Sequence, residues 1–96
     1  MRLASRADSN QREIVQALRT CGAAVQHIHR EGHGCPDILC GYKGKNYLLE
    51  IKMPGASLTK DELEWHSKWD GQVAVVHSIE EALNAIGCPV YLKNRA

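Results

Sequence analysis

Two short motifs at a fixed separation constrain this chain most: Gly34-Cys35-Pro36-Asp37, and further along Glu50-Ile51-Lys52. The turn-forming segment 41–46 lies between them and is flanked by apolar residues. We therefore predict an antiparallel hairpin of strands 36–40 and 47–53. Asp37 begins the first strand. Because side chains alternate along a strand, Glu50 and Lys52 share one face of the second.

Such a hairpin brings two carboxylates and an amine toward one point. Asp37 and Glu50, completed by water, suit Mg²⁺ or Mn²⁺, which are hard cations that prefer oxygen ligands. The main-chain carbonyl of Ile51 is a further candidate ligand, since it lies between two site residues. A metal here would activate water and stabilise charge on a phosphate. Lys52 would either orient the attacking water or neutralise the transition state, so we predict a small metal-dependent nuclease.

Each motif also has an ordinary structural interpretation. A Glu-x-Lys pair on an exposed strand simply faces water, and Gly-x-Pro-Asp is a common turn. The nuclease prediction rests on their combination at hairpin spacing, with capped helices in a fitting order around them.

Three capping boxes predict where helices begin: Asn10 with Glu13, Thr59 with Glu62, and Ser78 with Glu81. The helices then end near glycines at 22, 71 and 87. Residues 1–8 are expected to form a loose basic arm, and segments 24–29 and 73–76 to form strands, with 89–92 as an edge strand. The order of helix, three strands, helix, strand and helix predicts an α/β fold with a mixed central sheet flanked by helices.

Bulk properties restrict the class of protein. The 96 residues form one predicted domain, 1–96, with 44% hydrophobic and 24% charged residues and a net charge of +1. No apolar run has the roughly 18 residues of a membrane span, and the N-terminus lacks the apolar centre of a signal peptide. We therefore expect a cytoplasmic protein that does not enter a membrane.

The motifs Gly34-x-Pro36-Asp37 and Glu50-x-Lys52, with Leu58-Thr59 opening a helix, resemble the PD-(D/E)XK nuclease superfamily. More narrowly, the chain is similar to the stand-alone VRR-Nuc domains of phages and bacteria, from its first helix to about Leu83. This resemblance implies a restriction-endonuclease-like α-β-β-β-α-β core and metal-dependent DNA endonuclease activity. It also implies likeness to Holliday junction resolvases, and hence a homodimer that cuts branched DNA such as four-way junctions.

The resemblance further implies an acid on the first helix near the metal, which here is Glu13. The alternative for Glu13 is a purely local role in the capping box. Related sequences often carry Gln in the helix after the third strand, at the position of Glu62. Because this chain has Glu there, no catalytic role is carried over to Glu62.

Candidate DNA contacts come from the hairpin turn and the second helix: Lys43, Lys45, Lys60 and His66. Arg12, Arg30 and Lys68 are weaker candidates. His66 could touch phosphate or metal-bound water, or simply lie at the edge of the core. Trp65 and Trp69 lie one turn apart, which favours a place in the core or in a dimer interface over base stacking.

Two other functions stay open. A zinc module is suggested by His27, His29, His33, Cys35 and Cys40, although their spacing matches no known ribbon or finger. A non-catalytic DNA-binding module, or a subunit that depends on a partner, would agree with the near-zero net charge. The intact Asp37, Glu50 and Lys52 argue against a non-catalytic domain, whereas dependence on a partner stays open.

Overall fold

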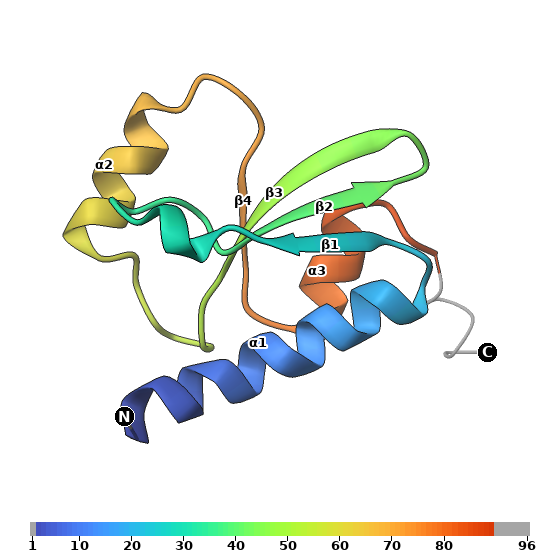
Figure 1. Ribbon diagram of the computed structural model, residues 1–96, viewed down its shortest axis with the longest axis horizontal. Coiled ribbons are helices and arrows are strands. Elements are labelled where there is room, and N and C mark those ends of the chain that lie inside the picture. Colours follow the sequence, from blue (N-terminus) through green and yellow to red (C-terminus); the bar gives the residue numbers. More distant parts are fainter. Residues whose placement is uncertain (1, 90–96) are drawn as a thin grey trace.

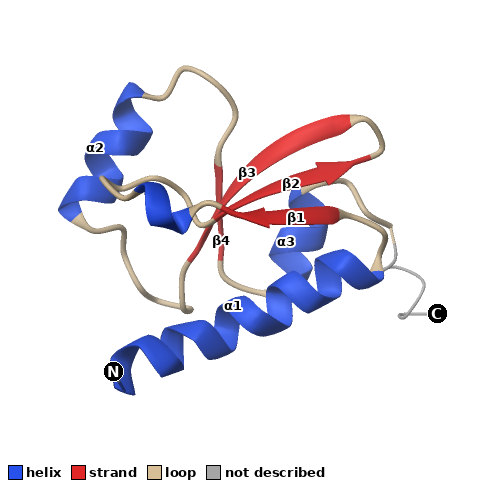
Figure 2. Cartoon of the chain, viewed as in Figure 1, coloured by secondary structure: helices blue, strands red, loops and turns tan. Residues whose placement is uncertain are grey.

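The computed structural model describes residues 2–89 (Figure 1). The elements in chain order are α1 (Arg2–Thr20), β1 (Ala24–His27), the short 3₁₀ helix η1 (His29–Glu31), β2 (Ile38–Tyr42), β3 (Lys45–Ile51), α2 (Lys60–Lys68), β4 (Ala74–Val76) and α3 (Ile79–Ala85). This order matches the prediction, and α2 stands apart from α1 and α3 at one end of the molecule (Figure 2).

The sheet is mixed, with strand order β1-β2-β3-β4. β1, β2 and β3 pair antiparallel, whereas β3 and β4 are parallel. The hairpin and the crossover through α2 are therefore as predicted from the sequence, and so is the α/β fold. Ile38 pairs with Leu49 in the hairpin, which places Asp37 directly opposite Glu50.

The core lies between the sheet and the pair of helices α1 and α3. Ile14 and Leu18 of α1 are fully buried, as is Leu49 of β3, and Leu83 of α3 and the C-cap residue Ile86 are almost so. The i, i+4 spacing of Ile14 and Leu18 puts both on the helix stripe that faces the sheet. No helix in the described residues is long and apolar enough to cross a membrane.

The first helix differs from the prediction. α1 begins at Arg2, so Asn10 is no N-cap, and residues 2–8 are helical where a loose arm was expected. Instead, the buried Asn10 side chain donates a hydrogen bond from Nδ2 to the carbonyl oxygen of Lys52, at 3.0 Å. A partner 42 positions along the chain cannot be seen in local sequence, and a side chain used in this way does not need to cap.

Of the other two caps, that of α2 forms completely. Thr59 accepts from the Glu62 N–H, and Glu62 accepts from the Thr59 N–H. In α3, Ser78 accepts from Glu81, but the Glu81 carboxylate bonds to His77 rather than to Ser78.

Strand boundaries also shift. The predicted strand 24–29 ends at His27, because the chain turns into η1. The hairpin strands run over 38–42 and 45–51, so the turn between them, at residues 43 and 44, is shorter than the predicted turn at 41–46. The predicted edge strand 89–92 lies, apart from residue 89, outside the described residues.

Candidate active site

Asp37 and Glu50 lie opposite each other on the hairpin and are 8% and 2% exposed. Directly opposed residues of an antiparallel pair have Cβ atoms about 5 Å apart. The carboxylate of Asp37 is held by the main chain, since its Oδ2 accepts a hydrogen bond from the Ile51 N–H at 2.7 Å. His29 Nδ1 lies 3.4 Å from the other oxygen, Oδ1. The hairpin thus presents two fixed carboxylates at one end.

Gly34 allows the loop before Asp37 to approach α2. Its φ is +82°, a left-handed conformation that favours glycine. A Cβ at this position would overlap the main-chain carbonyl of Asp61 in the first turn of α2. The glycine of the Gly-x-Pro-Asp motif therefore brings the two halves of the site together.

Glu50 carries the strongest electrostatic perturbation. Its burial, followed by the neighbouring carboxylates of Asp37 and Glu62, raises its pKa to about 9. Lys52 acts in the opposite direction but does not compensate. His66 Nε2 of α2 lies 3.4 Å from Glu50 Oε1. Glu50 faces away from the apolar core, and α2 covers it on that side.

Lys52 is held by Glu62, a residue to which the sequence analysis assigned no catalytic role. The Lys52 ammonium donates a hydrogen bond to Glu62 Oε1 at 2.9 Å. The same oxygen accepts from the Thr59 N–H at 2.8 Å. Burial opposes ionisation of Glu62, but the bonds from Lys52 and Thr59 outweigh it and lower the pKa of Glu62 below its ordinary value. The capping box was visible in the sequence, but the second use of its carboxylate was not.

A cavity of about 730 Å³ opens over these groups. It is lined from the sheet by Asp37, Glu50, Ile51 and Lys52, and from the helices by Asn10, Gln11 and Glu62, among others. Asn10 also fixes the end of β3 through its bond to the Lys52 carbonyl. Asn10 and Gln11 are polar residues of α1 at this cavity, and sequence reasoning missed both.

Other predicted residues lie elsewhere. Glu13 is exposed on α1 and does not line the cavity. Glu13 lies three residues after Asn10 in α1, and it is Asn10 that contacts the main chain at Lys52. The structure therefore does not bring Glu13 to the carboxylates, in contrast to what the resemblance implies.

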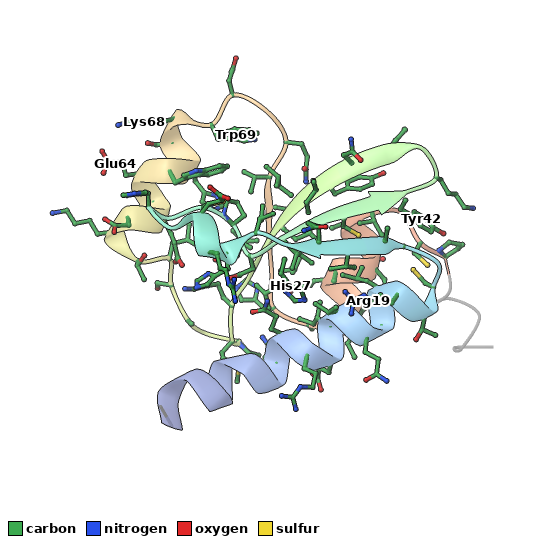
Figure 3. The ribbon with its side chains drawn as sticks, viewed as in Figure 1. Arg19, His27, Tyr42, Glu64, Lys68 and Trp69 are labelled. Atoms are coloured by element: carbon green, nitrogen blue, oxygen red, sulfur yellow. The ribbon has the colours of Figure 1, made fainter. Side chains whose placement is uncertain are left out.

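The predicted DNA contacts divide into two groups. Lys60 and His66 lie on α2 beside the site, and His66 contacts Glu50. Lys43 and Lys45 lie at the opposite end of the hairpin, next to Tyr42, which Figure 3 shows far from α2. At about 3.4 Å per residue, the six positions from Asp37 to Lys43 span roughly 20 Å.

The residues present fit a divalent cation of the oxygen-preferring kind. Burial, and after it the neighbouring carboxylate of Asp37, raises the pKa of Glu50 and opposes its ionisation in the absence of a cation. A cation between the two carboxylates would remove that opposition. Mg²⁺ is usually bound by one or two carboxylates and several waters, which matches a pair of carboxylates in an open cavity.

The zinc module finds no support. Among residues 2–89, no three His, Cys, Asp or Glu side chains come together as a metal-binding group. Cys40 is buried in the core, whereas His27, His29 and His33 are exposed. These residues are close in sequence, but the turn of the chain at η1 separates them in space.

Comparison with solved structures identifies the fold of this chain. A solved structure described as a VRR_NUC domain superposes with a TM-score of 0.68 and 22% sequence identity, over 83% of this chain and 92% of that one. This chain has the fold of a VRR_NUC domain. No protein-family model matches the sequence, and no curated protein matches it. The VRR_NUC fold therefore accounts for nearly the whole chain, while its activity has to be argued from the site.

Proposed function

We propose that the protein is a metal-dependent DNA endonuclease of the PD-(D/E)XK kind. The observation that carries this proposal is the opposition of Asp37 and Glu50 on the hairpin, with Lys52 beside them in the same cavity. The likeness to a VRR_NUC domain supports it. The preferred substrate is proposed to be branched DNA, such as a four-way junction.

Each residue of the site has a proposed role. Asp37 and Glu50, with the Ile51 carbonyl, would hold Mg²⁺ or Mn²⁺, and this ion would activate water and stabilise charge on the phosphate. The Ile51 N–H fixes the orientation of Asp37. His66 supports Glu50 from α2. Lys52, held in place by its hydrogen bond to Glu62, would stabilise negative charge that develops on the phosphate.

A homodimer is part of the proposal. Trp69 is 44% exposed and stacks on Trp65, with ring centroids 4.7 Å apart. Beside it, Leu39 and Leu48 of the hairpin line a hollow of about 370 Å³. A second copy would cover this apolar surface by a two-fold contact. Two sites related by that axis would suit the two strands cut at a junction.

The test is a cleavage assay with Mg²⁺ and with Mn²⁺ on linear, flapped, splayed and four-way DNA. Wild-type protein should cut when metal is present and stop with EDTA. Asp37→Asn should fold normally and lose at least 100-fold in rate, because loss of a metal-binding charge costs several kcal/mol in the transition state. Lys52→Ala should lose cleavage but keep Mn²⁺ binding measured by calorimetry, since an ammonium is not a ligand.

Two results would contradict the proposal. Cleavage by folded Asp37→Asn at the wild-type rate would exclude the site. Wild-type protein that binds DNA but cuts none of the four substrates would favour the non-catalytic binding module. Equal rates on all substrates would remove only the preference for branched DNA.

A further inference from the structure

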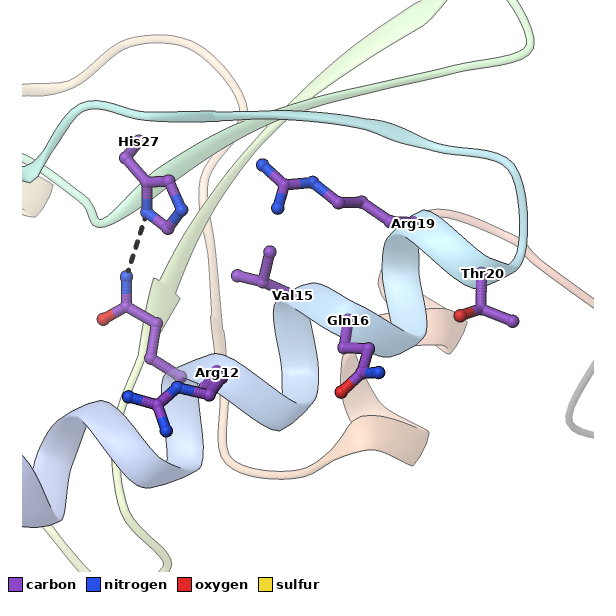
Figure 4. Close-up of a pocket in the computed structure, with 7 residues that line it drawn as sticks. Arg12, Val15, Gln16, Arg19, Thr20 and His27 are labelled. Carbon is purple, nitrogen blue, oxygen red and sulfur yellow. Dashed lines mark hydrogen bonds between the residues drawn. The ribbon is translucent and has the colours of Figure 1, made fainter.

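A second hollow, separate from the carboxylates, runs between α1 and β1 (Figure 4). It has a volume of about 710 Å³. Its polar lining comprises Gln11, Arg12, Gln16, Arg19, Thr20 and His27. None of its described lining residues is acidic. We refer to it as the α1–β1 groove.

The α1–β1 groove adjoins the candidate active site. Gln11 and His27 line both the groove and the cavity that contains Asp37 and Glu50. Gln11 Nε2 and His27 Nδ1 are 3.4 Å apart, so these two side chains meet at the junction of the two hollows. A chain-like ligand that lies in the groove would therefore lead to the carboxylates.

The cationic side chains of the groove are arranged along its length. Arg12 and Arg19 are seven residues apart, so they lie on the same side of α1, about 10 Å from each other along its axis. Arg19 extends toward β1 and donates a hydrogen bond from its guanidinium to the Val25 carbonyl, at 3.3 Å. Figure 3 shows Arg19 and His27 between the helix and the strand. A guanidinium has five N–H donors, so this bond fixes Arg19 and leaves donors for a ligand.

From these observations we infer that the α1–β1 groove binds the phosphate backbone of the DNA strand that enters the active site. The inference rests on the proposed function. From Gln11 to Thr20 the groove is about 14 Å long, which is long enough to contact more than one phosphate of a single strand. Arginine and amide side chains are the usual partners of phosphate oxygens. Lys43 and Lys45, at the far end of the hairpin, are then not the principal contacts.

The experiment measures binding apart from cleavage. Fluorescence anisotropy with a labelled four-way junction and a labelled linear duplex is recorded in EDTA over a range of NaCl concentrations. The test variant is Arg12→Glu/Arg19→Glu, and the matched control is Lys43→Glu/Lys45→Glu, which changes the charge equally. Arg12→Gln/Arg19→Gln is a milder second variant, in case charge reversal disturbs α1. Circular dichroism establishes that each variant is folded.

The groove variants should bind at least tenfold more weakly, and the control less than threefold. Loss of two phosphate contacts should also reduce the slope of log affinity against log salt by about 1.8. Wild-type affinity in both groove variants, or a greater loss in the hairpin control, would overturn the inference even if the wild type cleaves DNA. A wild type that binds through the groove but never cleaves would leave the inference standing and defeat the proposed function.

Discussion

Lys52 and Glu62 form a direct ion pair, with 2.9 Å between Nζ and Oε1. The Glu62 oxygen involved is the one that accepts from the Thr59 N–H at the start of α2. One carboxylate thus joins the end of β3 to the first turn of α2. A local capping motif has become the support of a proposed catalytic lysine.

Replacement of Glu62 should separate these two uses of its carboxylate. Glu62→Ala should lower single-turnover cleavage about 10- to 100-fold, because Lys52 loses its fixed partner. It should also cost about 1 kcal/mol of stability through the lost cap. Glu62→Gln should recover most of the rate, since its amide oxygen can accept from both Lys52 and Thr59.

Ser78→Ala provides the control for stability, because it removes the side-chain N-cap bond of α3, which Ser78 accepts from the Glu81 N–H, and Ser78 does not line the cavity. It should show the same loss of stability and cleave at the wild-type rate. An equal loss of cleavage in Ser78→Ala and Glu62→Ala would mean that Glu62 acts only through the stability of the fold.

The stability of the metal-free protein should depend on Glu50. Burial and its carboxylate neighbours raise the pKa of Glu50 from its ordinary 4.5 to about 9. The folded state therefore keeps a proton that the unfolded state loses, and the free energy of unfolding falls as pH rises through this window. Glu50→Gln, which has no such proton to lose, should raise Tm at pH 8 in EDTA and weaken the dependence of Tm on pH.

Glu13→Gln is the matched control, since Glu13 is exposed on α1. It should leave the pH dependence of Tm unchanged. It should also cleave DNA at the wild-type rate, because Glu13 does not line the cavity. A lower Tm for Glu50→Gln at pH 8 without metal would show that burial does not disfavour the charged Glu50 carboxylate.

Gly34 and Gly44 offer a comparison at equal backbone geometry, since both have φ of +82°. Alanine at either position costs about 1–2 kcal/mol of left-handed strain. Only at Gly34 would the added Cβ also overlap the backbone of α2. Urea denaturation should therefore show a greater loss for Gly34→Ala, and cleavage should fall with it. Equal losses for the two variants would show that the approach of the loop to α2 is not tight.

His66 should support metal binding rather than contact DNA. Its Nε2 lies 3.4 Å from the Glu50 carboxylate, and residues that orient a metal ligand typically contribute 10- to 100-fold in affinity. His66→Ala should weaken Mn²⁺ binding by about tenfold in calorimetry and leave DNA affinity in EDTA unchanged. The reverse pattern, with weaker DNA binding and normal Mn²⁺ affinity, would return His66 to the role that its sequence position suggested.

The proposed dimer can be tested by sedimentation at micromolar concentration. Wild-type protein should be a dimer, and Trp69→Glu should dissociate it because a charge would enter the apolar contact. Leu63→Glu, at an exposed position of α2 that does not line this hollow, should stay dimeric. A wild-type monomer that still makes paired, symmetric cuts in a four-way junction would indicate assembly on DNA. A monomer that cuts only single strands would contradict the resolvase-like proposal.

By itself, the sequence determined the order of the elements, the hairpin and the central pair of carboxylates. The reason is that these features depend on local periodicity, on turn residues and on cross-strand neighbours a few positions away. The cap at Thr59 and Glu62 was equally accessible, because all its atoms lie within one helical turn.

The tertiary structure alone decided which distant side chains join that pair. Asn10 bonds to Lys52, 42 positions away in the chain. Glu62 binds Lys52 in addition to its role in the cap, and His66 contacts Glu50. The α1–β1 groove exists only because α1 lies along the edge strand. Sequence periodicity predicts which face of a helix is buried. It does not predict which end of the helix lies at the site, because that depends on packing between elements far apart in the chain.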